Sequence, residues 1–403
     1  MNILQINTAD IKGGAGKVAY CLQNELEKQG HRSTLLVSRK YSHDNNIKLI
    51  RPDNNFRRRI LKKITYYLAN DLDFFPSEHI LKIPEFKNAD IVHCHNLHTN
   101  YFDLSTLERI SAVKPVVWTF HDMWPITAHC AHSFDGPLKE NGFFTCPSLD
   151  IYPPIAWHNE RYLERKKDKI YRKSKFHIVT PSKWLAEKTK ESILKDSPLS
   201  VIYNGIDTSV FSPSDRLKSR KQLDLPLDKN IILIVAKRGQ SNPWKGGNYA
   251  QEAIEAFRDD SRAFFVDLGG DTNQNSNNIK TVSYISNPTI LAKYYSSADM
   301  LLYPSIADNC PLVVLEAMAC GLPVIAFNTG GIPELVEHKV NGYIAKYKNA
   351  NDLKSGMDYL LNLHPQEVEK MRRYSTEKIK TGFTVEKMTE QYIDLYKKIE
   401  INF

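Results

Sequence analysis

The chain has few cysteines and no long uninterrupted apolar stretch. Its 403 residues include six cysteines, and their scattered positions favour reduced thiols over a disulfide framework. The longest apolar stretch, 311–327, contains Glu316 together with glycine and proline, so it does not fit a membrane span. The first residues lead directly into a strand-like segment and lack the basic start and apolar core of a signal peptide. We therefore expect a cytoplasmic protein, either free or peripheral at the inner face of the plasma membrane.

The sequence also lacks internal repeats, low-complexity tracts and the composition of a disordered chain. Hydrophobic residues make up 42% and charged residues 25% of the chain, as in ordinary globular proteins. The length suits two domains of roughly 200 residues each. The net charge of +8 comes from two segments, since 57–63 carries five basic and no acidic residues and 157–175 carries eight basic and three acidic residues. Neither segment accompanies a recognisable nucleic-acid-binding module, so we do not expect nucleic acid as a partner.

Short apolar runs alternate with helical periods in both halves of the chain. The runs are 3–7, 34–37, 91–95, 116–120, 178–181, 201–203, 231–236, 264–268, 280–284, 300–303 and 324–327. This alternation predicts two parallel sheets covered by helices, and hence two Rossmann-like domains. Turn residues at 204–207 place the domains at 1–207 and 208–382. Apolar residues at helical spacing in 383–403 predict a last helix that packs back on the first domain.

Two carboxylates, Asp308 and Glu316, stand on either side of the start of a short apolar helix. Pro311 suits the first helical position, and Gly321 suits a left-handed stop after the helix. The exposed N–H groups at the helix start carry partial positive charge and can bind phosphate. Carboxylates that accept sugar hydroxyls beside donors to phosphate predict a nucleotide-sugar site.

Two further segments carry groups suited to phosphate. Glycines at 13–16 follow the first strand and open a helix, although their spacing is not the dinucleotide fingerprint and a structural turn is the alternative. Arg238 and Lys245 follow the first strand of the second half, where ligands bind in open α/β sheets. There they would clamp a diphosphate, with solvated loop cations as the alternative.

These segments together resemble the family 4 glycosyltransferases, which are retaining enzymes of the GT-B fold. The donor motif covers 304–326 and 330–334. The likeness extends to 13–16, 119–122, 181–182, 204–207, and Arg238 with 245–246. The resemblance implies an α/β protein in which two Rossmann-like domains face each other across a deep cleft. The amino-terminal domain would bind the acceptor and the carboxyl-terminal domain the nucleotide-sugar donor.

The same resemblance implies roles for individual residues in donor binding. Arg238 and Lys245 would hold the donor diphosphate, helped by the backbone of Gly14. Glu316 would accept hydrogen bonds from the ribose hydroxyls. Asp308 would bind hydroxyls of the transferred sugar and is one methylene shorter than the usual Glu, which leaves the sugar open. The pocket would be completed by backbone amides around Asn309, Cys310 and Leu312.

The resemblance also implies a catalytic set of His121, Arg238, Lys245 and Asp308. His121 follows the strand-like run 116–120 and would contact the donor sugar or the acceptor. Transfer would be metal-independent, with same-face attack and a donor phosphate oxygen taking the acceptor proton. We expect no cofactor beyond the nucleotide-diphosphate sugar, UDP- or GDP-linked.

Histidines and cysteines in the first half leave zinc open as an alternative. The residues concerned are His93, His95, His98, His129, Cys130, His132 and Cys146. Their spacing lacks the tight ligand pairs of a fixed zinc site, so we assign no metal.

Segment 56–68 predicts a basic amphipathic helix. Its apolar face is Phe56, Ile60, Leu61, Ile64, Tyr67 and Leu68. Together with 157–175, such a helix would suit an anionic membrane surface, with a core-packed helix as the alternative. We therefore expect a saccharide acceptor, lipid-linked, in bacterial surface polysaccharide or lipopolysaccharide synthesis. A nucleotide-sugar epimerase and a non-catalytic sugar-nucleotide binding partner in a synthetic complex remain alternatives.

Overall fold

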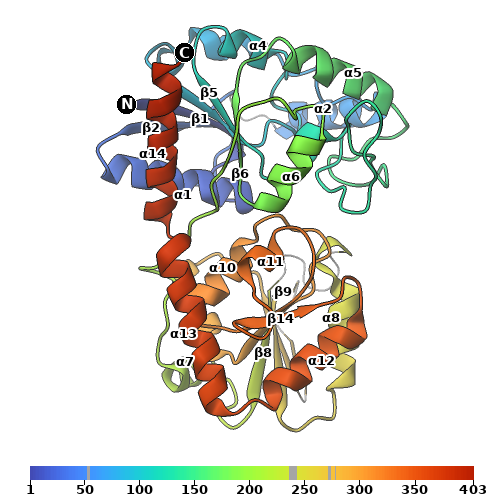
Figure 1. Ribbon diagram of the computed structural model, residues 1–403, viewed down its shortest axis with the longest axis vertical. Helices are drawn as coiled ribbons and strands as arrows, with labels where there is room; N and C mark the ends of the chain where they lie inside the picture. The colour runs from blue at the N-terminus through green and yellow to red at the C-terminus, as the bar shows by residue number, and fades with distance from the viewer. Residues whose placement is uncertain (52–54, 236–242, 271–273, 277) are drawn as a thin grey trace. The chain divides into compact units, whose positions relative to one another are not determined.

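The protein, analysed as a computed structural model, is described at residues 1–51, 55–235, 243–270, 274–276 and 278–403 and forms two compact units. Unit 1 contains Met1–Tyr203 and Glu386–Phe403, and unit 2 contains Asn204–Val385. The sequence placed the divisions at 207/208 and 382/383, a few residues from the observed ones. Each unit is a sheet with helices packed on it (Figure 1), which confirms two Rossmann-like domains.

Unit 1 is built on a sheet in which neighbouring strands run parallel. The strand order is β3-β2-β1-β4-β5-β6-β7, so the direction of winding reverses between β1 and β4. The strands are β1 (Asn2–Ala9), β2 (Arg32–Arg39), β3 (Ile47–Leu49), β4 (Ile91–Cys94), β5 (Val116–Thr119), β6 (His177–Thr180) and β7 (Leu199–Val201). The helices are α1 (Gly14–Lys28), α2 (Asn55–Tyr67), η1 (Glu78–Lys82), α3 (Pro84–Lys87), α4 (Thr106–Ser111), η2 (Trp124–Ile126), α5 (Glu160–Tyr171), α6 (Lys183–Glu191) and α14 (Val385–Ile401).

The two faces of this sheet are covered by different helices. On one face Trp118 packs with Leu107 of α4 and Leu163 of α5 in a single buried cluster. On the other face Leu35 and Val37 of β2 pack against α1. Because side chains alternate along a strand, the near-continuous apolar runs fit a sheet buried on both faces.

The last helix of the chain, α14, belongs to unit 1. Its Tyr396 hydroxyl lies 2.6 Å from His93 Nδ1, and its Tyr392 hydroxyl lies 2.9 Å from Thr119 Oγ1. All four side chains are buried. The helix therefore covers β4 and β5 through polar contacts in which buried hydroxyl and imidazole groups satisfy one another.

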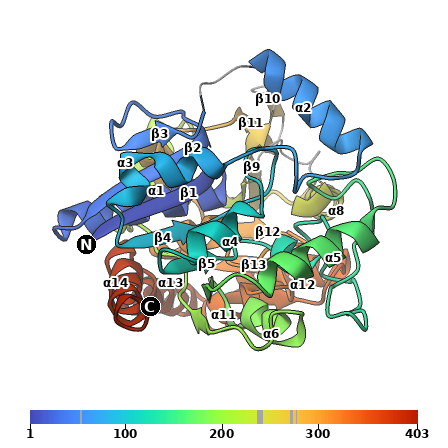
Figure 2. The same ribbon diagram turned by 90° about the horizontal axis from the view of Figure 1, so that it is seen from above.

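Helix α2 forms where the sequence predicts it, but its apolar side chains are not packed in a core. Phe56 is 74% exposed, Tyr67 66% and Leu68 47%. Figure 2 shows the helix at the margin of unit 1, clear of the strands. The alternative of a core-packed helix therefore does not hold for these side chains.

Unit 2 repeats the plan with strand order β10-β11-β9-β8-β12-β13-β14. Neighbouring strands run parallel except for the antiparallel pair β10 and β11. The strands are β8 (Asn230–Val235), β9 (Ala263–Gly270), β10 (Gln274–Ser276), β11 (Ile279–Ser283), β12 (Met300–Tyr303), β13 (Val324–Phe327) and β14 (Gly342–Ala345). The helices are α7 (Arg216–Gln222), η4 (Pro243–Lys245), α8 (Gly247–Ala256), α9 (Pro288–Ser297), α10 (Leu312–Ala319), α11 (Ile332–Leu335), α12 (Ala350–Leu361) and α13 (Pro365–Gly382).

In unit 2 the winding reverses between β8 and β12, and the helices again divide between the two faces. Helices α8 and α12 cover one face, whereas α10 and α13 lie on the other (Figure 1). In open α/β sheets, ligands bind beyond the carboxyl ends of the strands at such a reversal. We therefore expect ligand-binding residues directly after β8 and β12.

The contact between α14 and the sheet gives a test of stability. We expect Tyr396→Phe to lower the free energy of unfolding by about 1–3 kcal/mol, because His93 Nδ1 stays buried and loses its partner. Urea unfolding followed by circular dichroism measures the change. Tyr374→Phe is the matched control, since this hydroxyl contacts Glu337 at the surface of unit 2 and the ring is 41% exposed. Equal small effects in the two variants would contradict the expectation.

Candidate functional site

The predicted residues Lys245 and Asp308 meet at the winding reversal of unit 2. Lys245 ends η4, which follows β8, and Asp308 follows β12. Lys245 Nζ lies 2.5 Å from Asp308 Oδ2. The other predicted phosphate ligand, Arg238, lies outside the described residues.

Asp308 collects several donors on one carboxylate oxygen. Besides Lys245, the hydroxyls of Tyr303 and Ser305 each donate to Oδ2 at 2.6 Å. No described residue donates a hydrogen bond to Oδ1. Burial alone would raise the pKa of Asp308, but the Lys245 ammonium and the hydroxyl donors outweigh it and hold the pKa below its ordinary value. The result is an ionised carboxylate with one oxygen still available to a ligand hydroxyl.

Gly246 explains why the Lys245 loop lies so close to the end of β12. Its φ is 69°, and a Cβ at this position would lie 1.8 Å from the Pro304 carbonyl oxygen. Only glycine fits this contact without displacing backbone. The glycine therefore keeps Lys245 within reach of Asp308.

Helix α10 follows the Asp308 loop and ends where the sequence predicts. Gly321 has φ 75°, and the N–H groups of Gly321 and Leu322 donate to the carbonyls of Met318 and Ala317. These two bonds are the Schellman pattern of a left-handed helix stop. At the other end Pro311 is the N-cap and not the first helical residue, so the helix begins one residue later than predicted, at Leu312.

Glu316 lies inside α10 and is only 2% exposed. Its Oε2 accepts a hydrogen bond of 2.8 Å from the buried Tyr295 hydroxyl. Burial raises the pKa of Tyr303 well above its ordinary value, and the charges of Asp308 and Glu316 raise it further, so both carboxylates act on this ring. The two predicted acids thus share a neighbourhood, and the ribose contact of Glu316 stays a prediction.

The remaining donor-pocket residues lie around the start of α10. Asn309 and Cys310 are buried, and Leu312 is half-buried. The Asn204 side chain donates to the Cys310 carbonyl at 3.0 Å. The sequence marks Asn204 as a turn residue and as part of the family likeness, but does not predict this contact. The contacts of Tyr303, the last residue of the predicted strand 300–303, and of Ser305, two residues beyond it, are not predicted either.

The glycine loop in unit 1 combines structural positions with an open one. Gly13 has φ 80°, and a Cβ on Gly16 would lie 2.7 Å from the Asp10 carbonyl oxygen. A Cβ on Gly14 would meet no atom within 4 Å. The structural-turn alternative therefore accounts for Gly13 and Gly16, whereas the space before Gly14 remains open to a ligand.

His121 in unit 1 belongs to a chain of neutral polar groups. Its Nε2 lies 3.0 Å from His95 Nδ1, and His95 Nε2 lies 2.9 Å from Gln5 Oε1. The Gln5 amide donates to Ser33 Oγ, which orients its oxygen towards His95. His95 must then donate from Nε2 and accept at Nδ1, so His121 donates from Nε2. His121 Nδ1 is left as a hydrogen-bond acceptor.

Burial keeps these imidazoles uncharged. It lowers the pKa of His121 to about 4 and the pKa of His95 well below its ordinary value. At neutral pH His121 can therefore accept a hydrogen bond at Nδ1, but it is a weak base. The next residue, Asp122, accepts from His98 Nε2 at 2.9 Å and from the Trp124 N–H.

Zinc is the alternative that the histidines and cysteines of unit 1 leave open. Among the described residues, no three His, Cys, Asp or Glu side chains are grouped as a metal site would require. All six cysteines are free thiols, and the Cys130 N–H donates to Cys146 Sγ at 3.3 Å.

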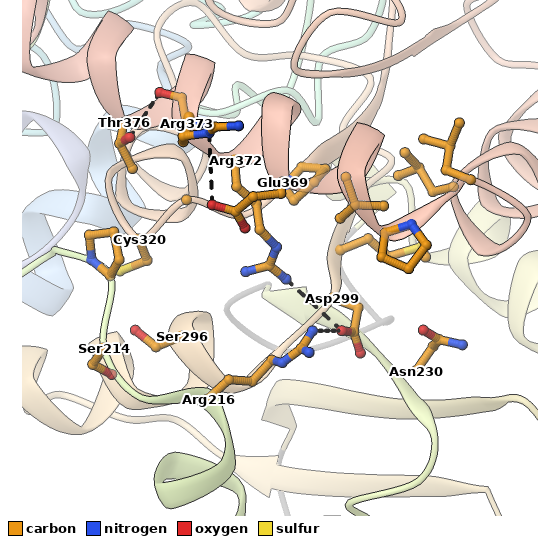
Figure 3. Close-up of a pocket in the computed structure, with 18 of the residues that line it drawn as sticks. Ser214, Arg216, Asn230, Ser296, Asp299, Cys320, Glu369, Arg372, Arg373 and Thr376 are labelled. Atoms are coloured by element: carbon orange, nitrogen blue, oxygen red, sulfur yellow. Dashed lines mark hydrogen bonds and ion pairs between the residues drawn. The ribbon is translucent and has the colours of Figure 1, made fainter.

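A cavity of about 610 Å³ lies elsewhere in unit 2 and is not the donor pocket. Figure 3 shows Arg216 and Arg372 directed at Asp299, with Nη atoms 2.6 Å and 4.0 Å from its Oδ1. Asp299 and Asn230 stand at the amino ends of β12 and β8. Since ligands bind at the carboxyl ends of such strands, we interpret this cavity as structural.

The neutral histidines predict acid sensitivity. His121 has a pKa of about 4 in the folded protein, whereas an unfolded histidine takes up a proton near pH 6.5. Stability should therefore fall as the pH drops from about 6.5 towards 4, by up to about 1.4 kcal/mol per pH unit for each such histidine. In urea titrations at several pH values, His121→Gln should give a shallower acid limb. If the stability of the variant fell with acid as steeply as that of the unsubstituted protein, the low pKa of His121 would be contradicted.

Comparison with known proteins covers nearly the whole chain. The model described as "Glycosyltransferase Family 4" matches residues 12–210, and the model described as "Glycosyl transferases group 1" matches residues 215–380. The relative named "Putative colanic acid biosynthesis glycosyl transferase WcaC", from Escherichia coli (strain K12), is 22% identical across 99% of this chain and 100% of its own.

Solved structures show the same fold. Sucrose-phosphate synthase from Thermosynechococcus elongatus superposes with a TM-score of 0.70 at 19% identity, over 100% of this chain and 99% of its own. HepE of Anabaena, in complex with UDP, has a TM-score of 0.66 at 15% identity, over 99% of this chain and 100% of its own. With both units matched by family models and the whole chain matched by solved structures, the protein belongs to the family 4 glycosyltransferases of GT-B fold.

Proposed function

We propose that the protein transfers a sugar from a nucleotide-diphosphate donor to a saccharide acceptor, with retention of configuration and without a metal ion. The pairing of Lys245 with Asp308 at the winding reversal of unit 2 carries this proposal. A cation there suits a diphosphate, and a carboxylate with a free oxygen suits a sugar hydroxyl. Unit 2 would bind the donor and unit 1 the acceptor.

Lys245 would exchange its partner when the donor binds. Its side chain is 30% exposed and held by Asp308 and the Tyr303 hydroxyl. A diphosphate offers the ammonium more negative charge than one carboxylate does, so Lys245 would turn to the phosphates and offset the charge that develops on the leaving nucleotide. Asp308 would keep its two hydroxyl donors and accept a hydroxyl of the transferred sugar.

The properties of His121 support transfer with help from the substrate's own phosphate. An efficient general base has a pKa near the working pH, whereas burial lowers the pKa of His121 to about 4. His121 would therefore position a hydroxyl through Nδ1 and leave proton removal to another group. A donor phosphate oxygen on the same face as the departing diphosphate fits that role and accounts for retention.

The names of relatives supply the proposed process and donor. WcaC is named for colanic acid biosynthesis, and HepE was solved with UDP. We propose a UDP- or GDP-linked donor and a lipid-linked saccharide acceptor in bacterial surface polysaccharide or lipopolysaccharide synthesis. Asp308 in place of Glu leaves the transferred sugar open.

The exposed face of α2 supports association with an anionic membrane surface. Phe56, Ile60 and Tyr67 are exposed on a helix that also carries basic residues, the arrangement of interfacial helices. Along the described residues, no helix combines the length and apolar content needed to cross a membrane. Segment 157–175 contributes less than its composition predicted, because Lys167 is buried and Lys166 and Arg172 are ion-paired.

Donor binding can be tested with a panel of UDP-, GDP-, ADP- and TDP-sugars. A ligand that binds only the folded state raises the melting temperature, and at 100 times its dissociation constant it adds about 2.7 kcal/mol of stability. We expect a UDP- or GDP-sugar to produce the largest shift by differential scanning fluorimetry. The free sugars are the controls, and a panel with no shift would contradict the proposal.

Lys245 gives the sharpest test of catalysis. We expect Lys245→Gln to lower kcat/KM by about 100-fold or more, because the leaving diphosphate loses a preorganised cation. Tyr303 and Ser305 still donate to Asp308 in this variant, so circular dichroism should show an intact fold. Lys380→Gln, which changes an exposed lysine of α13, is the matched control and should turn over normally. Turnover of Lys245→Gln at the rate of the control would overturn the assignment.

A further inference from the structure

Unit 1 contains a cavity of about 1020 Å³ whose described lining includes none of His121, Lys245 and Asp308. We call it the α2 cavity. Its walls come from the end of β2, from α2, from the segment after β4 and from the loop 152–155. The carboxyl ends of β2 and β4 flank β1, where the winding reverses, so the cavity occupies the position at which such folds bind ligands.

The charges on the wall are almost all of one sign. Arg39, Arg59, Lys62 and Lys63 line the cavity and are exposed. None of the four forms an ion pair with a described residue, in contrast to Lys166, Lys139 and Arg172 in the same unit, which are all paired. Like charges held together without partners repel one another, so an anionic ligand would be stabilised here.

One acidic side chain lies at the buried side of the cavity. Asp71, the one acidic residue among its described lining, is 6% exposed, and neither carboxylate oxygen has a hydrogen-bond partner among the described residues. A buried polar group without a partner costs free energy. Both oxygens are also buried from solvent, so Asp71 lies behind the basic wall and does not itself present an oxygen to a ligand in the cavity.

Aromatic rings complete the wall and connect it to the histidine chain. Tyr41, Tyr66 and Tyr152 line the cavity, and such rings offer apolar faces with polar tips to a sugar. The edge of Tyr152 packs on His98 with ring centroids 5.6 Å apart. His98 in turn contacts Asp122, the neighbour of His121. A saccharide in the cavity would thus lie beside the segment that carries His121.

Backbone strain marks the same wall. Thr99 and Asn100 both line the cavity and both have positive φ, 78° and 64°. A β-branched residue pays a steric cost in this region, and such strain gathers at ligand sites.

We propose that the α2 cavity binds the acceptor and that the acceptor is a saccharide carrying a phosphate or diphosphate group. The anion lies against Arg39 and the lysines of α2, and the sugar packs against the tyrosine rings of the wall. This inference rests on the proposed function, because it names the acceptor of the same reaction. The phosphate can belong to a soluble sugar phosphate or to a lipid-borne diphosphate, since the chemistry recognised is the same.

Binding of N-acetylglucosamine 1-phosphate, measured by calorimetry at low salt, tests the anion site. We expect binding that is absent with N-acetylglucosamine, that weakens as salt is raised, and that falls about 10-fold in Arg39→Gln. Arg39→Lys should recover most of it. Arg32→Gln is the matched control, because Arg32 is an exposed arginine at the other end of the same strand.

The double variant Lys62→Gln and Lys63→Gln should weaken binding to a similar extent. Its control is Lys397→Gln with Lys398→Gln, an exposed lysine pair on α14. A short-chain polyprenyl-diphosphate N-acetylglucosamine in phosphatidylcholine vesicles forms the second arm. Binding of the soluble probe assigns a free phosphate, and binding of the vesicle probe alone assigns a lipid-borne one. Binding of neither, or equal loss in variants and controls, overturns the proposal.

The nucleotide-sugar panel keeps the two proposals apart. A protein that binds a nucleotide sugar but neither phosphate probe would overturn the anionic acceptor and leave the transferase function standing. A protein that binds a phosphate probe through Arg39 but no nucleotide sugar would overturn the transferase function, and with it the acceptor role of the cavity. Arg39→Gln should leave the nucleotide-sugar shift unchanged, because Arg39 is not among the residues assigned to donor binding.

Discussion

The ionised carboxylate of Asp308 is the constraint on which the proposed donor site depends. A buried charge is costly unless other groups satisfy it. Three donors converge on its Oδ2, Lys245 from the segment after β8 and two hydroxyls from the end of β12 and the residues that follow it. That convergence fixes the ends of β8 and β12 relative to each other and holds Lys245 at the winding reversal. Without a ligand, the carboxylate takes the place that phosphate would have beside the ammonium. The site is therefore organised for negative charge before the donor arrives.

The candidate site residues of unit 1 are neutral, in contrast to the charged pair of unit 2. Gln5, His95 and His121 pass hydrogen bonds in one direction, and burial lowers the pKa values of both imidazoles. A neutral acceptor at His121 Nδ1 can orient a hydroxyl without competing for the proton that the hydroxyl must lose. The charge that develops during transfer would thus lie on the diphosphate beside Lys245, whereas His121 would only hold the hydroxyl in place.

The parts predictable from sequence are those whose signal is local. Apolar runs located the main strands, and Pro311 with Gly321 bounded α10 to within one position at its start. The edge strands β3, β10 and β14 were missed because they are short and at most partly apolar. Tyr303 and Ser305 were missed as partners of Asp308 because their contact depends on where a loop turns. The direction of the hydrogen bonds from Gln5 through His95 to His121 depends on the register of β1 and β4. This register pairs Gln5 with His93, and no local sequence pattern encodes it.

Lys167 shows how a long-range contact reverses a prediction from composition. It counts among the basic residues of 157–175, yet it is fully buried and donates to the carbonyls of Trp124 and Thr127 at 2.6 Å and 2.9 Å. Its ammonium lies over the Trp124 ring, 3.6 Å from the centroid, and burial lowers its pKa to about 8.

The consequence of that buried lysine reaches the candidate acceptor site. Lys167 fixes the segment around Trp124, and the Trp124 N–H donates to Asp122 Oδ1. Asp122 then holds His98, which packs against Tyr152 in the wall of the α2 cavity. A residue that composition assigns to a membrane-facing surface instead supports the segment shared by the cavity and His121. The proposed acceptor position in unit 1 would therefore depend on a buried ammonium.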